Sequence, residues 1–167
     1  MTEANTLKIL KNAILLEKRG QAFYQTVADR TQTQAVKKFF EIMAGEEEEH
    51  IKILSEQFKS FKNNNKFKTR DYVSKEAVNV VSNVLTKELQ EQISGAGFES
   101  AAISAAISME QKSIELYSQR AETAENVEEK KLYQWLCQWE QGHLDMLVKM
   151  DKELTEKIWN DNRFWPF

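Results

Sequence analysis

Two four-residue stretches, EEEH at Glu47–His50 and EQGH at Glu140–His143, are Glu-x-x-His motifs and contain the only two histidines of this 167-residue chain. Each motif follows a separate glutamate at the same distance. These glutamates are Glu17 and Glu110, each 30 residues before the glutamate that begins its motif. The chain therefore carries the same set of potential metal ligands twice.

The repeat extends beyond these six residues, because the two halves of the chain align at a constant offset of 93 residues. Identical residues at this offset include Ala13/Ala106, Ile14/Ile107, Tyr24/Tyr117, Ala28/Ala121, Lys37-Lys38/Lys130-Lys131 and Leu54/Leu147. A single repeat of this length indicates a duplicated helical hairpin rather than a solenoid array.

Hydrophobic residues recur every three or four positions through both halves, which is the spacing of an amphipathic helix. The only proline is Pro166, and the five glycines leave long stretches free of helix breakers. We therefore predict an all-α protein with four long helices. The second and third are separated by a crossover of roughly 40 residues, in which Ser74 could begin a shorter helix that ends near Ser94.

The length and hydrophobic content suit one domain with a single core. We expect residues 1–155 to form the four-helix bundle and residues 156–167 to form an aromatic tail that packs on the bundle or on a partner subunit. Trp135 and Trp139 lie one turn apart on the fourth helix, off the face that carries Glu140 and His143. The crossover or a second subunit would have to cover them, so a homodimer is one expectation.

Composition excludes several classes of function. With 23 basic and 26 acidic side chains, the chain has a net charge of -3 and no basic excess of the kind that attracts nucleic acids, so we expect no nucleic-acid partner. No signal peptide or membrane-spanning stretch is evident, so we expect a soluble cytoplasmic protein with no membrane partner. The single cysteine, Cys137, cannot form an internal disulfide or supply the four thiolates of a rubredoxin or zinc-ribbon site.

The six repeated residues are candidate metal ligands because they occupy positions where the hydrophobic stripes otherwise place Leu, Ile, Met or Phe. A glutamate and a histidine three residues apart share one face of a helix and can hold one ion. Four buried carboxylates are severely unfavourable unless they are neutralised. Two divalent cations would balance them, with both imidazoles neutral. Mixed carboxylate and imidazole ligation suits iron or manganese.

Simpler interpretations exist for each feature. A single Glu-x-x-His motif is common on solvated acidic helices, whereas two in phase, each with its upstream glutamate, indicate a metal site. Glu46, Glu48 and Glu49 are expected to face solvent, although Glu46 could approach the rim of the site. Tyr24 and Tyr117 could be ordinary core aromatics.

At these residues the sequence resembles the rubrerythrin branch of the ferritin-like di-iron carboxylate proteins. Residues 13–24 look like the first helix of that family and residues 44–50 like its second, and the resemblance covers about Leu7 to Leu154. It implies a ferritin-like four-helix bundle that holds two iron ions, with manganese or a mixed pair as alternatives.

The resemblance also implies individual roles. Glu17 and Glu110 would be terminal ligands, Glu47 and Glu140 would bridge the ions, and His50 and His143 would each bind one ion. Tyr24 and Tyr117 would donate hydrogen bonds that orient the carboxylates.

Two departures separate this chain from full-length rubrerythrins. It has no paired Cys-x-x-Cys motifs, so electrons would come from an external rubredoxin-like protein or flavoprotein. Ile107 stands where rubrerythrins place an additional glutamate, which brings the ligand set closer to bacterioferritin and manganese-catalase-like sites.

We expect a non-haem di-iron oxidoreductase that reduces hydrogen peroxide or dioxygen. The alternatives are a ferroxidase, or an iron-binding protein for storage, delivery or sensing without turnover. A helical interaction protein that retains the ligands as relics is a further possibility, because this fold hosts many activities.

Overall fold

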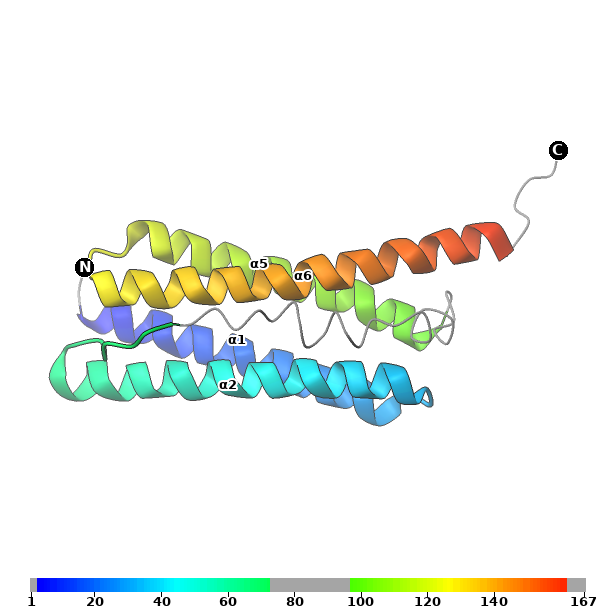
Figure 1. Ribbon diagram of the computed structural model, residues 1–167. Coiled ribbons are helices and arrows are strands. Elements are labelled where there is room, and N and C mark those ends of the chain that lie inside the picture. The colour runs from blue at the N-terminus through cyan, green and yellow to red at the C-terminus, as the bar shows by residue number, and fades with distance from the viewer. Residues whose placement is uncertain (1–2, 73–96, 162–167) are drawn as a thin grey trace.

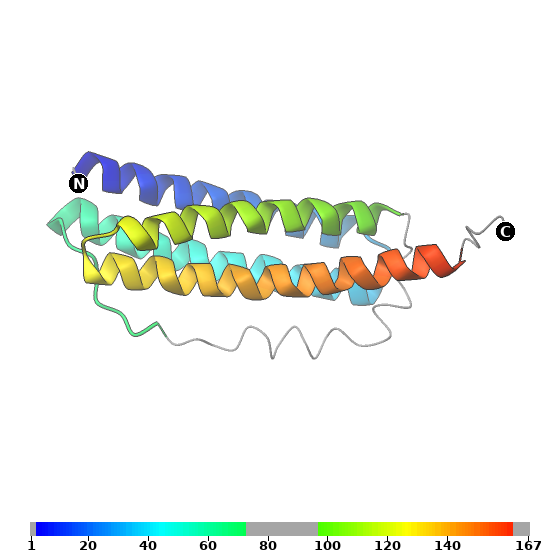
Figure 2. The same cartoon turned by 90° about the horizontal axis from the view of Figure 1, so that it is seen from above.

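The computed structural model describes residues 3–72 and 97–161, and within these ranges the regular structure is helical, without strands. The four helices are α1 (Glu3–Arg30), α2 (Gln34–Asn64), α5 (Phe98–Thr123) and α6 (Val127–Asp161). They run side by side as an elongated bundle (Figures 1 and 2). The predicted all-α class and the four long helices are thus confirmed.

The bundle consists of two antiparallel hairpins, α1 with α2 and α5 with α6, joined within each hairpin by three residues. Local signals set the helix ends. Asn65 ends α2 in the left-handed conformation, at φ 52°, and its backbone N–H bonds to the Phe61 carbonyl. The Asn126 side chain accepts hydrogen bonds from the backbone N–H groups of Glu128 and Glu129 at the start of α6. The three-residue connections hold each pair antiparallel, and the second connection contains the Asn126 cap.

The hydrophobic core has two parts, at opposite ends of the bundle. One cluster includes Phe39, Phe40, Met43, Leu147 and Met150. The other includes Leu10, Leu54, Tyr117, Leu132 and Leu136. On each helix, the glutamates and histidines of the repeat fall between residues of the two clusters. The packed ends therefore hold a buried polar layer at mid-bundle.

At one pair of equivalent core positions, the two hairpins differ in charge. The first hairpin buries Val27 and Val36, whereas the second has Arg120 and Glu129 at the same offset of 93 residues. Both charged side chains are buried, with relative exposures of 5% and 3%. Arg120 Nε donates to Glu129 Oε1 at 2.8 Å, and the second guanidinium nitrogen bonds to the same oxygen. An ion pair thus replaces an apolar contact.

Several expectations concern residues outside the described ranges. The short crossover helix expected from Ser74 to about Ser94 is among them, as is the tail from residue 162 onwards. α6 itself continues to Asp161, past residue 156, where the sequence suggests that the tail begins. None of the helices in the described part of the chain has the length and hydropathy that a bilayer-spanning segment requires.

We predict that Glu129→Ala destabilises the protein by about 3 kcal/mol, because it removes a buried carboxylate from a buried guanidinium. The double substitution Arg120→Val with Glu129→Val copies the first hairpin and restores an apolar pair. Its stability should lie within about 1 kcal/mol of the wild type or exceed it. Urea unfolding followed by circular dichroism measures both values. A double variant as unstable as Glu129→Ala would contradict this account.

Candidate metal centre

All four helices contribute to the buried polar layer. α1 supplies one glutamate, α5 supplies another, and α2 and α6 each supply a glutamate and a histidine one turn apart. Each of the six residues has a relative exposure of 3% or less. They are Glu17, Glu47, His50, Glu110, Glu140 and His143. The structure therefore brings all the predicted ligand residues into one buried region.

The first group of ligand atoms surrounds His50. It comprises Glu17, Glu47, His50 and Glu140, whose ligand atoms lie within 4.8 Å of one another. Nδ1 of His50 is 3.2 Å from Glu17 Oε2, 3.4 Å from Glu47 Oε2 and 3.0 Å from Glu140 Oε1. One imidazole nitrogen thus faces three carboxylates from three helices.

The second group surrounds His143. It comprises Glu47, Glu110, Glu140 and His143, again with ligand atoms within 4.8 Å of one another. Nδ1 of His143 is 3.2 Å from Glu140 Oε2, 3.6 Å from Glu110 Oε1 and 3.8 Å from Glu47 Oε1. Glu47 and Glu140 belong to both groups. The two groups, each of which could hold a metal ion, therefore overlap at two carboxylates.

This geometry suits metal ions better than hydrogen bonds. An imidazole Nδ1 carries at most one proton, so it cannot satisfy three carboxylates at once. Glu47 Oε2 and Glu140 Oε1 are buried and make no hydrogen bond of acceptable geometry with the described residues. Two ligands bound at about 2.1 Å to one ion lie roughly 3.0 to 3.4 Å apart when their bond angle is between square and tetrahedral. The contacts of His50 fall in that range.

Two tyrosines link the hairpins across the site. The Tyr24 hydroxyl donates to Glu110, and the Tyr117 hydroxyl donates to Glu17, so each tyrosine bonds to the glutamate of the other hairpin. Burial and the neighbouring charges of Glu110 and Glu17, respectively, raise the pKa of each tyrosine well above its usual value of 10.0. Both hydroxyls therefore remain protonated donors.

The metal-free cluster has strongly shifted pKa values. Burial, followed by the charge of Glu140, raises the pKa of Glu47 well above its usual value and that of Glu110 to about 8. Burial lowers the pKa of both histidines, but nearby carboxylates raise it well above 6.5. Glu140 acts most strongly on His50, and hydrogen bonding to Glu110 acts most strongly on His143. Burial raises the pKa of Glu140, but the charges and hydrogen bonds of His50 and His143 together more than offset this effect and lower that pKa well below its usual value. Without metal, protons partly neutralise the carboxylates.

Glu46 reaches further into the site than the sequence suggests. Its Oε2 lies 2.7 Å from Nε2 of His143, on the side of the ring away from the other carboxylates. The side chain has a relative exposure of only 16%. Glu46 adjoins Glu47 and was expected to face solvent or at most to approach the rim. Its contact depends on the packing of α2 against α6, which helical spacing alone does not reveal.

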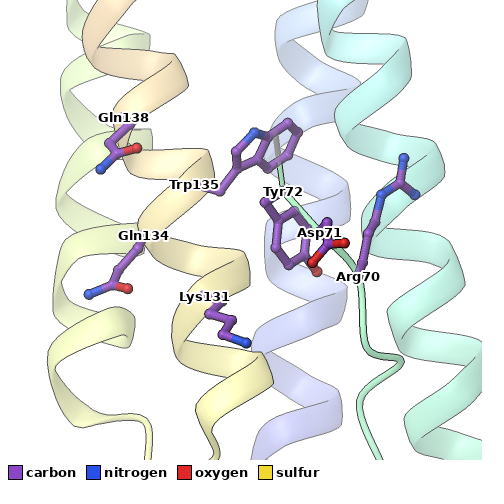
Figure 3. A pocket seen from close by; sticks show the side chains of 7 residues that line it. All are labelled: Arg70, Asp71, Tyr72, Lys131, Gln134, Trp135 and Gln138. Atoms are coloured by element: carbon purple, nitrogen blue, oxygen red, sulfur yellow. The ribbon is translucent and has the colours of Figure 1, made fainter. Parts of the chain in front are cut away.

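The side of the His50 ring that faces away from the carboxylates contacts aromatic rings, whereas the same side of His143 contacts Glu46. Trp135 and Trp139 pack against its ring in edge-on arrangements, with ring centroids 5.4 and 5.5 Å away. Tyr72 lies on Trp135 at 5.4 Å, and these two rings border an open pocket of about 330 Å³ (Figure 3). The tryptophans, expected to lie off the ligand face and to need a cover, therefore pack beside the site. Trp135 retains a relative exposure of 8%.

A small cavity of about 10 Å³ adjoins the carboxylates between α1 and α5. This volume suffices for about one water molecule. Its lining consists largely of residues related by the 93-residue repeat, Leu16 with Met109, Gly20 with Ser113, and Glu17 with Glu110, together with Tyr24 and Glu47. A Cβ atom on Gly20 would lie 3.4 Å from Glu47 Cδ, so glycine leaves space beside this carboxylate. Small molecules could approach the site here.

Comparison with known proteins agrees with the architecture. The family model described as Rubrerythrin matches residues 8–151 of the chain, a range that includes all six residues of the cluster. No curated protein and no solved structure matches the chain significantly. The four-helix arrangement is that of the ferritin-like bundle expected from the sequence. From the extent of this match, the chain belongs to the rubrerythrin family.

Proposed function

We propose that the protein is a non-haem di-iron oxidoreductase that reduces hydrogen peroxide with electrons from a separate donor. The observation that carries this proposal is the pair of overlapping ligand groups, which share Glu47 and Glu140. Membership of the rubrerythrin family supports iron as the metal. The absence of thiolates in the cluster and the mixture of carboxylates with imidazoles also favour iron or manganese.

In this proposal, Glu17 and His50 would hold one ion, Glu110 and His143 would hold the other, and Glu47 and Glu140 would contribute to both. The four carboxylate charges balance two divalent cations when both imidazoles are neutral. When bound, two ferrous ions supply Lewis acidity and the two electrons that, with two protons, reduce one hydrogen peroxide to two waters.

The residues around the cluster would position its carboxylates and limit the access of water and large molecules. Tyr24 and Tyr117 hold the terminal carboxylates of the opposite hairpins, which fixes the ligand positions before metal binds. The two core clusters exclude bulk water at both ends. The cavity beside Gly20, with room for about one water molecule, leaves no space for a large substrate on this side of the cluster. The single cysteine cannot build an iron-sulfur centre, so a separate protein would deliver the electrons.

We expect the protein, reconstituted anaerobically with ferrous iron, to bind two ions per chain and to be oxidised faster by hydrogen peroxide than by oxygen. Stopped-flow absorbance with each oxidant measures this preference. Replacing both bridging residues by Gln, in Glu47→Gln with Glu140→Gln, should abolish binding of the pair and remove the metal-induced rise in melting temperature. Glu48→Gln, on an exposed position of α2, is the matched control.

The opposite preference, with oxygen reacting faster than peroxide, would refute the peroxidase proposal and favour ferroxidase activity. A wild-type protein that binds less than one metal ion per chain would refute the metal centre altogether. Storage would require a closed shell, so a monomer or dimer in light scattering would exclude that form of iron binding.

We predict that the metal-free protein becomes less stable between about pH 5 and pH 8. The pKa of Glu110 is about 8 in the folded protein, against 4.5 ordinarily, so the folded state retains a proton that the unfolded state releases. Stability from this group is complete at low pH and is lost as pH rises through the folded-state value. The raised pKa values of Glu47 and both histidines act in the same direction.

Thermal unfolding at pH 6 and pH 8 measures this change. Because metal ions displace the same protons, the apparent affinity for a divalent cation should rise over this pH range. Glu110→Gln remains neutral at every pH and should reduce the pH dependence of the metal-free protein, leaving the part due to Glu47 and the histidines. A melting temperature that rises between pH 6 and pH 8 would contradict the assignment of these protons.

A further inference from the structure

The two imidazoles of the cluster have different surroundings on their outer sides. Nε2 of His143 contacts Glu46 Oε2 at 2.7 Å. Nε2 of His50 is buried and makes no hydrogen bond with any residue in the described ranges. The repeat traces this difference to one pair of equivalent positions, because the residue of α6 that corresponds to Glu46 at the offset of 93 is Trp139. One half-site has a carboxylate where the other has an indole.

From this difference we infer that the two metal positions are not equivalent, and that Glu46 makes the position held by His143 the tighter one, filled first. Glu46 is then a positioning residue that acts through His143. This inference rests on the proposed metal centre and adds an order of binding to it. The first ion would occupy the group of Glu47, Glu110, Glu140 and His143.

The physical reason lies in the proton of each imidazole. Nδ1 of both histidines faces the carboxylates, so metal binding through Nδ1 requires the proton to sit on Nε2. At His143 that N–H donates to the Glu46 carboxylate, which fixes the ring and makes Nδ1 a better electron donor. A carboxylate behind a metal-binding imidazole typically strengthens metal affinity by about 10- to 100-fold.

At His50, the tautomer that carries its proton on Nε2 has no carboxylate to accept a hydrogen bond from that nitrogen. Its Nε2–H would point among the rings of Trp135 and Trp139, where the described residues offer it no hydrogen-bond acceptor. The Trp139 indole N–H is itself a donor and is also buried without a partner in the described part of the chain. Nδ1 of His50 lies among three carboxylates, so an ion that binds there displaces the Nδ1 proton. The N–H that remains on Nε2 then has no acceptor among the described residues.

Anaerobic titration of the metal-free protein with Co²⁺, followed by calorimetry and visible absorption, tests the inference. The wild type should bind two ions in distinct steps. Glu46→Gln keeps a hydrogen-bond acceptor but loses the charge, and it should weaken the first step by about 10-fold. Glu46→Ala loses both and should weaken it by up to about 100-fold, so that the two steps merge. The absorption bands of the first ion should shift in both variants.

Two further variants separate this effect from general damage. Glu48→Gln removes the same charge from an exposed position of α2 and should leave both steps unchanged. Trp139→Gln places an amide acceptor at the position equivalent to Glu46 and should tighten the second step while leaving the first unchanged. Circular dichroism checks that each variant is folded.

Three outcomes would overturn the inference while leaving the metal centre in place. These are two equal binding steps in the wild type, a first step that is insensitive to Glu46→Ala, and a second step that is unchanged in folded Trp139→Gln. Failure of the wild type to bind Co²⁺ at all would instead refute the proposed metal centre.

Discussion

Four carboxylates and two imidazoles occupy the middle of an otherwise apolar bundle, and the need to neutralise them governs the rest of the structure. Charged carboxylates lose their hydration when they are buried, and only protons or cations can compensate for that loss. The metal-free cluster relies on protons, as the raised pKa values of Glu47 and Glu110 show. Two cations would replace those protons. The hydrophobic clusters at both ends of the bundle provide the stability that tolerates such a layer.

The duplicated hairpin explains why the site can be dinuclear. Each hairpin supplies two carboxylates and one imidazole, which do not enclose an ion on their own. The pseudo-twofold packing brings the two sets together, and Glu47 and Glu140 then belong to both groups. Tyr24 and Tyr117 bond across the same axis, each to the opposite hairpin. Because every half of the site depends on both hairpins, metal binding and correct pairing of the hairpins stabilise each other.

The two halves of the chain also differ at buried positions that the repeat makes equivalent. In the core of the second hairpin, Arg120 and Glu129 occupy the positions that two valines occupy in the first. These positions are ten or more residues from the ligands along their helices. Trp139 replaces Glu46 beside the ligands, which leaves the outer nitrogens of His50 and His143 in unlike surroundings. The first difference concerns the packing of one hairpin. The second gives the two histidines unlike surroundings, and the proposed difference between the two metal positions rests on it.

The spacing of hydrophobic residues, the scarcity of glycine and proline, and the repeated Glu-x-x-His motifs were sufficient to predict four helices and six clustered polar residues. They were sufficient because helical periodicity fixes which side chains share a face, as it does for Glu47 with His50. Periodicity carries no information on how one helix faces another. Only the tertiary structure therefore showed that Glu46 contacts His143, that Trp135 and Trp139 enclose His50, and that each tyrosine bonds to the opposite hairpin. These contacts join residues 85 to 100 positions apart, and the packing of the hairpins decides them.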